Sequence, residues 1–271
     1  MLTLLVLTDF SPAADYALQY AAALAAPGGA HLVLLHVRPS LLSANALTTS
    51  SVAETEEDAY ALLRQRLLTL PPTLPASAAV VSGEVGAEVA AAVRQREAAV
   101  VVVGRPELGS VPDELVHTTS LGLLRHLPCA LLVVPLRTAA TVPPRRALLA
   151  VDDQPLPRTP GTAGLHPLLG HTALTVAFVA DEEVAADPAR AFANAQQAGL
   201  LGGFGPTQER GFAATAPAAG IADATALVQP DLLVLVARRR SLLGRLFHQS
   251  VTAAVVREAT VPVLVLPEHA D

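Results

Sequence analysis

The chain carries LLVVP at residues 131–135 and VLVLP at residues 263–267, two versions of one apolar strand that lie 132 positions apart (267 − 135). A second pair of matching segments opens each copy: LTDFSP at residues 7–12 corresponds to AVDDQP at residues 150–155, 143 positions further on. Self-similarity of this length indicates an internal duplication. The sequence therefore predicts two related domains in tandem.

The expected domains are residues 1–138 and 145–271, joined by a linker that contains Pro143 and Pro144. In the first domain, short apolar runs alternate with stretches of helical character, which predicts a parallel sheet flanked by helices. Ser11 and Pro12 form a typical helix start. The expected strands are residues 4–8, 31–37, 78–82, 99–103 and 130–134, and the expected helices begin near residues 12, 54, 85 and 113.

The second domain repeats this order less regularly. Five proline and glycine residues crowd positions 155–164, where the first domain has a clean helix, so its first helix should be short and late, near residues 164–169. The other expected elements are strands at residues 147–151, 173–179, 232–236 and 261–266, and helices at residues 188–199, 218–228 and 249–259.

Composition excludes several classes of function. All 18 basic residues are arginine, so the chain lacks the lysine that a Walker phosphate loop, a Schiff-base mechanism or a protein kinase requires. The net charge of −6 argues against a nucleic-acid-binding protein. No apolar run reaches membrane-spanning length and no basic leader precedes the first strand, so we expect a cytoplasmic protein with no membrane partner. We expect the single cysteine, Cys129, to be buried in the core.

The residues LVLTDFS at 5–11, VVVG at 101–104 and LLRHLPC at 123–129 resemble the universal stress protein family, as do SLLGRLF at 241–247 and SVT at 250–252. The resemblance spans nearly all of both halves and is weakest from residue 153 to 212. It implies an α/β fold of two tandem doubly wound Rossmann-like domains, each with a five-stranded parallel sheet flanked by helices. It also implies that the fifth strands associate, pairing the two domains; a further dimer of chains is left open.

Family members that bind ATP carry Gly-x-x-Gly, nine residues and then Gly-Ser/Thr after the fourth strand, and use an Asp that ends the first strand. In the first half this pattern retains Asp9, Gly104 and Thr118, but Glu107 and His117 replace glycines. A carboxylate about 4 Å from a phosphate costs up to about 4 kcal/mol at an effective dielectric of about 20. We therefore expect the first half to be unfit to hold a triphosphate.

In the second half all three glycines are replaced, while Asp152 and the hydroxyl residue Ser250 remain. Arg238 and Arg239 lie in the replaced loop and could grip an anion through their side chains, or could form a solvated basic loop. Asp9 and Asp152, the acidic residues at the end of the first strand of each half, are also compatible with ordinary helix capping.

The eight histidines show no metal-ligand spacing and no nucleophile–base pair is apparent, so we expect no metal site and no catalysis. The prediction is a degenerate tandem member of the stress family, without a required cofactor, that acts by binding partner proteins and by assembly. The alternative is a regulatory protein that binds ATP or AMP in the second half. A slow ATP hydrolase is a third possibility, for which the sequence offers neither base nor metal ligands.

Overall fold

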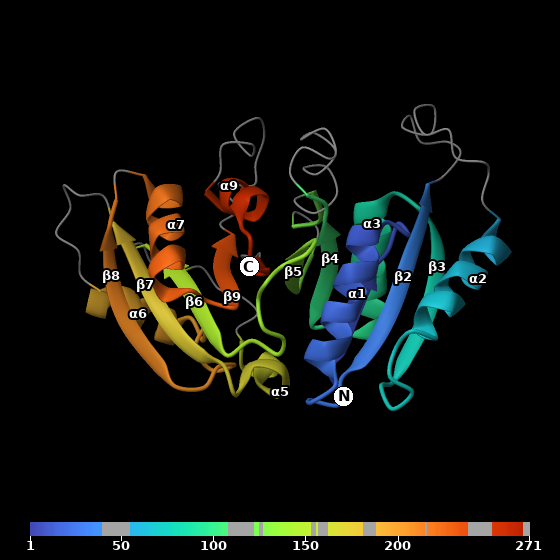
Figure 1. The fold of residues 1–271 in the computed structure, drawn as a ribbon, viewed down its shortest axis with the longest axis horizontal. Coiled ribbons are helices and arrows are strands. Elements are labelled where there is room, and N and C mark those ends of the chain that lie inside the picture. The colour runs from blue at the N-terminus through green and yellow to red at the C-terminus, as the bar shows by residue number, and fades with distance from the viewer. Residues whose placement is uncertain are drawn as a thin grey trace.

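The computed structural model describes residues 1–39, 55–107, 122–124, 127–152, 156, 162–180, 188–214, 216–237 and 251–267. Strands and helices alternate along the chain as the sequence predicts (Figure 1). The strands are β1 (Thr3–Leu7), β2 (His31–Pro39), β3 (Ala76–Gly83), β4 (Val100–Arg105), β5 (Ala130–Pro135), β6 (Arg146–Val151), β7 (Ala173–Ala180), β8 (Thr207–Ala213), β9 (Leu232–Ala237) and β10 (Val263–Pro267). The helices are α1 (Pro12–Ala25), α2 (Glu56–Leu67), α3 (Val85–Arg96), α5 (His166–Leu169), α6 (Pro188–Gln197), α7 (Pro217–Val228) and α9 (Val251–Glu258).

All ten strands belong to one sheet, in the order β3-β2-β1-β4-β5-β10-β9-β6-β7-β8. Each half contributes five parallel strands in the same relative order. In each half the first strand lies next to the fourth, and the order in which strands are added to the sheet reverses between these two. This is the doubly wound arrangement, and it confirms the predicted fold class. In Figure 1 the arrowheads of β4 and β9 both point to the upper side.

The halves meet along β5 and β10, the only antiparallel pair among the described strands. Leu132 pairs with Leu264, and these two residues are counterparts at the 132-residue spacing of the duplication. Val133 pairs with Val263 and Leu131 with Val265, so the ladder is symmetric about that central pair. The two domains are therefore related by a pseudo-twofold axis of the kind found in isologous dimers.

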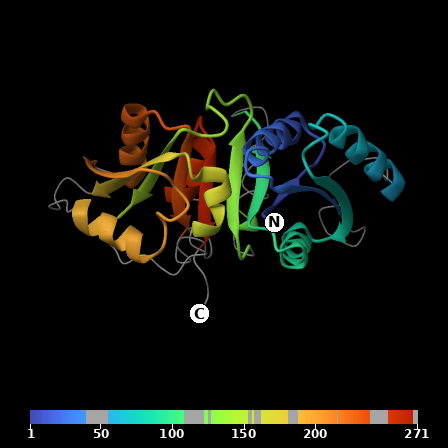
Figure 2. The same cartoon turned by 90° about the horizontal axis from the view of Figure 1, so that it is seen from below.

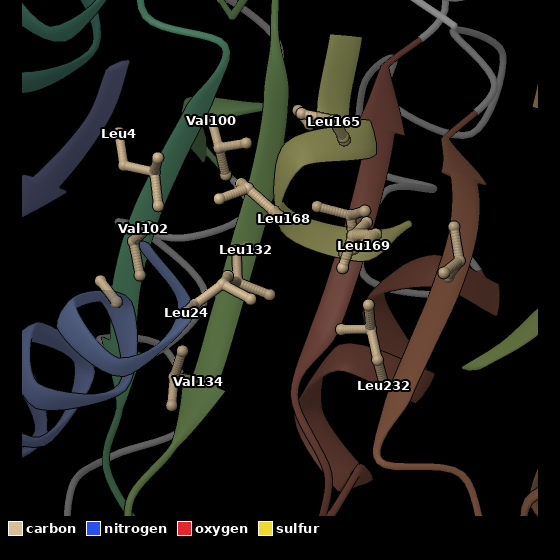
Figure 3. Packing of buried hydrophobic residues seen from close by; sticks show 14 of the residues in the cluster. Leu4, Leu24, Val100, Val102, Leu132, Val134, Leu165, Leu168, Leu169 and Leu232 are labelled. Carbon is tan, nitrogen blue, oxygen red and sulfur yellow. The ribbon is translucent and has the colours of Figure 1, made fainter. Parts of the chain in front are cut away.

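Two apolar cores run across this junction, one on each face of the sheet. In each half helices cover both faces: α1 and α3 lie on opposite sides of the first half, and α6 and α7 on opposite sides of the second (Figure 2). Over β5 and β10, three leucines of the α5 region, Leu165, Leu168 and Leu169, fill the space against Leu132 and Leu264 (Figure 3). The short helix of the second half thus covers the junction itself.

Local sequence explains how the first-half helices begin. Ser11 Oγ accepts a hydrogen bond from Ala14 N at 3.3 Å, and Pro12 occupies the first turn of α1, as predicted. Thr55 and Asp58 form a reciprocal capping box at the start of α2. The acidic residues near position 56 are thus a helix start, in agreement with the sequence analysis.

The second half departs from the first in two places. The first described helix of this half, α5, begins at His166 after a 3-10 turn at Ala163–Leu165, close to the predicted position. Strand β8 was not predicted, although the fold class requires a fifth strand. Its sequence, TQERGFA, is polar because β8 is an edge strand whose residues Gln208, Glu209 and Arg210 are exposed. An apolar-run criterion cannot detect such a strand.

Several polar contacts hold the linker and the domain junction in place. The Asp231 carboxylate accepts hydrogen bonds from the backbone N–H groups of Thr141, Arg145 and Arg146 at 3.0–3.3 Å. Burial alone would raise the pKa of this carboxyl, but the three N–H donors and the charge of Arg146 outweigh it and hold the pKa below its usual value.

None of the helices within the described ranges has both the length and the apolar character that a membrane span requires.

Asp231→Ala should lower the free energy of unfolding by about 2–3 kcal/mol at neutral pH, because it leaves linker N–H groups without an acceptor. A depressed folded-state pKa stabilises the fold above the unfolded value of about 4, and this contribution is lost as the pH falls through the folded value. Urea unfolding of variant and wild type should therefore converge in acid. Asp223→Ala, at an exposed site on α7, is the control and should change stability by less than about 0.5 kcal/mol; an equal loss in both variants would contradict the assignment.

Candidate functional site

The candidate crevice of each half lies where the strand order reverses, at the carboxyl ends of its first and fourth strands. In the first half these are the ends of β1 and β4. Asp9 lies shortly after the end of β1, and Gly104 lies within β4, next to its last residue. In the second half they are the ends of β6 and β9, with Asp152 directly after β6. Asp9, Gly104 and Asp152 therefore lie at or near the ends of these strands, and their part in binding a ligand stays a prediction.

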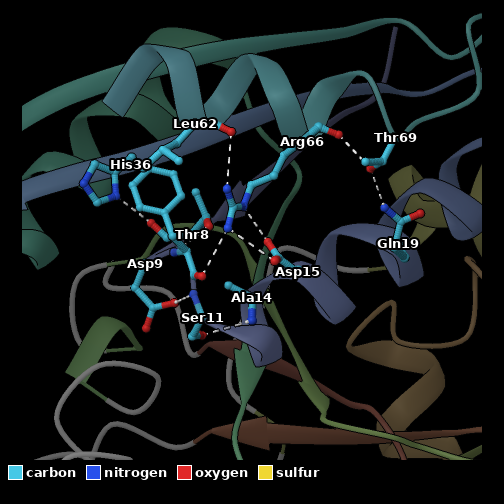
Figure 4. Close-up of polar contacts among 11 residues, drawn as sticks. Thr8, Asp9, Ser11, Ala14, Asp15, Gln19, His36, Leu62, Arg66 and Thr69 are labelled. Atoms are coloured by element: carbon cyan, nitrogen blue, oxygen red, sulfur yellow. Dashed lines mark hydrogen bonds and ion pairs between the residues drawn. The ribbon is translucent and has the colours of Figure 1, made fainter. Parts of the chain in front are cut away.

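The turn after β1 is built from hydrogen bonds between near neighbours (Figure 4). Asp9 is exposed, and its Oδ1 accepts a hydrogen bond from Ser11 N at 2.9 Å. Thr8 Oγ1 accepts one from Phe10 N at 3.0 Å, and Phe10 has a left-handed backbone with φ 64°. His36 Nδ1 donates to the Thr8 carbonyl oxygen at 2.8 Å. One oxygen of the Asp9 carboxylate is thus committed to the turn.

Arg66 of α2 reinforces this turn from outside (Figure 4). Its guanidinium bonds both carboxylate oxygens of Asp15 and donates to the Phe10 carbonyl oxygen at 3.1 Å. Its Cζ also lies 4.8 Å from the centroid of the Phe10 ring. The Phe10 ring in turn lies beside the His36 ring, with the two centroids 4.4 Å apart. Cation–π and charge-assisted contacts of this type fix the turn. Arg66 is a residue that the sequence analysis did not single out.

Gly104 is required by the packing of α1 on the end of β4. A Cβ atom at this position would overlap the carbonyl group of Ala13 and would lie 2.8 Å from Ala14 N. Both are backbone groups and cannot move aside as a side chain does. This close approach of helix and strand accounts for the glycine without any ligand.

Other charged residues at the first crevice also have protein partners. Glu107, at a family glycine position, forms an ion pair with Arg137 at 3.4 Å, in which both side chains are at least half exposed. Arg105 is only 5% exposed and donates from Nη2 to the carbonyl oxygen of Ala259, just beyond α9. Its burial lowers the pKa of the guanidinium, and its Nε has no hydrogen-bond partner. Arg105 thus links the first crevice to the second domain.

Asp152 and Val236 are described residues at the second crevice. Asp152 is half-buried and has an interaction partner, and Val236 in β9 occupies a family glycine position. The remaining predicted site residues, Thr118, Arg238, Arg239 and Ser250, lie outside the described residues, as do His117 and most of the helix expected at residues 113–126. Their part in a site stays a prediction.

Two observations concern metal binding and the single thiol. They contain no group of three or more His, Cys, Asp or Glu side chains arranged to hold a metal ion. Cys129 is buried, as predicted, and its burial raises the pKa of the thiol to about 12. A thiol in this state is a poor nucleophile.

Comparison with known proteins places these features in a family. The model described as the universal stress protein family matches residues 1–135 and 166–267. No curated protein matches the chain in sequence. The fold is similar to a universal stress protein from Archaeoglobus fulgidus DSM 4304, at 14% identity and a TM-score of 0.64, covering 99% of this chain and 97% of that one.

Two further solved structures were matched, one over nearly the whole chain and one over half of it. A functionally unknown protein from Pseudomonas aeruginosa PAO1 is 17% identical with a TM-score of 0.55, and covers 98% of this chain and 92% of its own. A universal stress protein in complex with cAMP matches 49% of this chain over 96% of its own, at 17% identity and a TM-score of 0.39. For the two structures that match nearly the whole chain, identities of 14% and 17% mean that the likeness concerns the fold alone.

Gly104→Ala should lower the free energy of unfolding by about 3 kcal/mol, because the added methyl group has to displace the backbone of α1. Gly164→Ala is the matched control: no heavy atom lies within 4 Å of the position that its new methyl group would take, and the change should stay within about 0.5 kcal/mol. Chemical denaturation measures both. Equal stability of Gly104→Ala and wild type would show that α1 does not press against β4.

Proposed function

Because the chain belongs to the universal stress protein family, we propose that it acts in the stress response by binding other proteins and by assembly, without catalytic turnover. The two domains form one continuous sheet with shared cores, which suits a rigid binding scaffold. The absence of a membrane-length helix from the described ranges is compatible with a cytoplasmic location, which is part of the proposal.

One observation carries the non-nucleotide part of the proposal: three arginines near the first crevice, among the residues that the structure describes, already have protein partners. Arg66 contacts Asp15, Arg137 contacts Glu107, and Arg105 contacts the backbone of Ala259. Asp9 and Glu107, both exposed, add two carboxylates close to the ends of β1 and β4. A triphosphate entering here would meet negative charge and would have to compete for each of these three arginines.

The alternative is a nucleotide-regulated protein that binds ATP or AMP in the second crevice. It is supported by the sequence alone, through Asp152, Ser250 and the arginines at positions 238–240. Arginine side chains can bind phosphate without a glycine loop, so the loss of the family glycines does not exclude such a site. The two functions differ in a measurable way.

Calorimetric titration with ATP and Mg²⁺ tests the proposal. We expect no binding in the micromolar range, because neither crevice retains the family's backbone cradle. Saturable binding that is lost in the Arg239→Ala/Arg240→Ala double variant would establish the alternative instead. Glu107→Gly is the control from the other half and should leave any such second-half binding intact.

Turnover is tested separately by measuring phosphate release from ATP. We expect no release above background, since the described residues offer neither a metal site nor a nucleophile–base pair. Release that disappears in Asp152→Ala would overturn the non-catalytic assignment.

A further inference from the structure

The two outer edges of the ten-stranded sheet differ in character. One edge is β8, where the exposed residues Glu209 and Arg210 place charges on the strand. The other edge is β3, ASAAVVSG, which has no charged residue and no proline over eight residues. Uncharged edge strands of this length readily pair with another strand, and charge on an edge is a common way to prevent it. The contrast identifies β3 as the edge open to pairing.

Among the described strands, none pairs with the outer side of β3. Leu32 N of β2 donates to Pro75 O at 2.9 Å, and the register runs from Leu32 opposite Ala76 to Pro39 opposite Gly83. Because bonding groups alternate along a parallel strand, odd-numbered residues of β3 bond to β2, while Ala78 and Val80 direct N–H and C=O to the free edge. No backbone hydrogen bond within the described part of the chain reaches these outward groups.

Helix α2 adds a self-complementary row of side chains beside this edge. It packs mainly on β3 at the outer flank of the molecule (Figure 1). The buried residues Ala59 and Leu63 face the core, and Arg66, which bonds Asp15 of α1, marks the side of α2 that faces α1. At 100° per residue, Glu57, Tyr60 and Arg64 lie on the opposite side. Glu57 and Arg64 are exposed and Tyr60 is half-buried.

We propose that two copies of the chain associate through antiparallel pairing of β3 with β3, with the outward row of α2 facing its own copy. A twofold axis at this edge puts both α2 helices on one face, just as the pseudo-twofold pairing of β5 with β10 puts α1 and α5 on one core. The helices then run in opposite directions, and Glu57 of each copy faces Arg64 of the other, with the two Tyr60 side chains near the axis. The acid and the base at opposite ends of the row select the second copy as the partner.

Sedimentation velocity of the full chain tests the pairing. We expect a species of twice the 27.9 kDa chain mass at micromolar concentrations. Ala78→Pro removes an outward N–H without touching the β2 ladder, and proline is tolerated at a free edge, so this variant should be folded by circular dichroism and monomeric. The control is Glu209→Pro on β8, where Leu174 N bonds Pro206 O and the odd-numbered residues face outward; it should remain dimeric.

Charge reversal keeps the test decisive if Ala78→Pro fails to fold. Glu57→Arg and Arg64→Glu should each weaken the dimer by about tenfold or more, since each change sets like charges against each other at two places in the dimer. The double variant Glu57→Arg/Arg64→Glu should restore wild-type affinity. A wild-type chain that stays monomeric, a dimer equally sensitive at both sheet edges, or a double variant no better than the single ones would each overturn the proposal. The proposal is independent of nucleotide binding at the crevices.

Discussion

The pairing of β5 with β10 is the constraint on which the rest of the molecule depends. Each half is an open sheet whose fifth strand is wholly apolar, and such a strand cannot remain at an edge in water. Antiparallel pairing of the two fifth strands removes both edges at once, merges the cores on either face, and fixes where Arg105 and α5 have to lie. The chain therefore behaves as one folded unit built from two similar parts, and its remaining edges are β3 and β8.

The described residues at the first crevice make contacts that stabilise the fold. Asp9 caps the turn after β1, Gly104 admits the backbone of α1, and three nearby arginines hold α2, the domain junction and the loop after β4. In the second half the described helix after β6 is the short α5, which covers the junction. The two halves have therefore diverged in local structure after the duplication, and they do not offer the same surface to a ligand.

Much of the fold could be predicted from the sequence, because buried parallel strands are continuous apolar runs and the repeat aligns them. The late start of α5 followed from the prolines before it. Strand β8 was missed because an exposed edge strand needs no apolar pattern. The position of Gly104 was predicted, but not the close backbone contact with Ala13, and the contact of Arg66 with Asp15 joins residues 51 positions apart. Such long-range partners leave no local periodicity. Thr118, Arg238, Arg239 and Ser250 remain predictions.

The central pair of Leu132 and Leu264 also bears on how a fused protein can change. In a dimer of identical subunits, a mutation on the axis is necessarily doubled, so an enlarged side chain collides with its own copy. Here the two positions are encoded separately. A larger residue at one can be balanced by a smaller one at the other, which makes asymmetric solutions accessible to this molecule by single steps that a symmetric ancestor could not take.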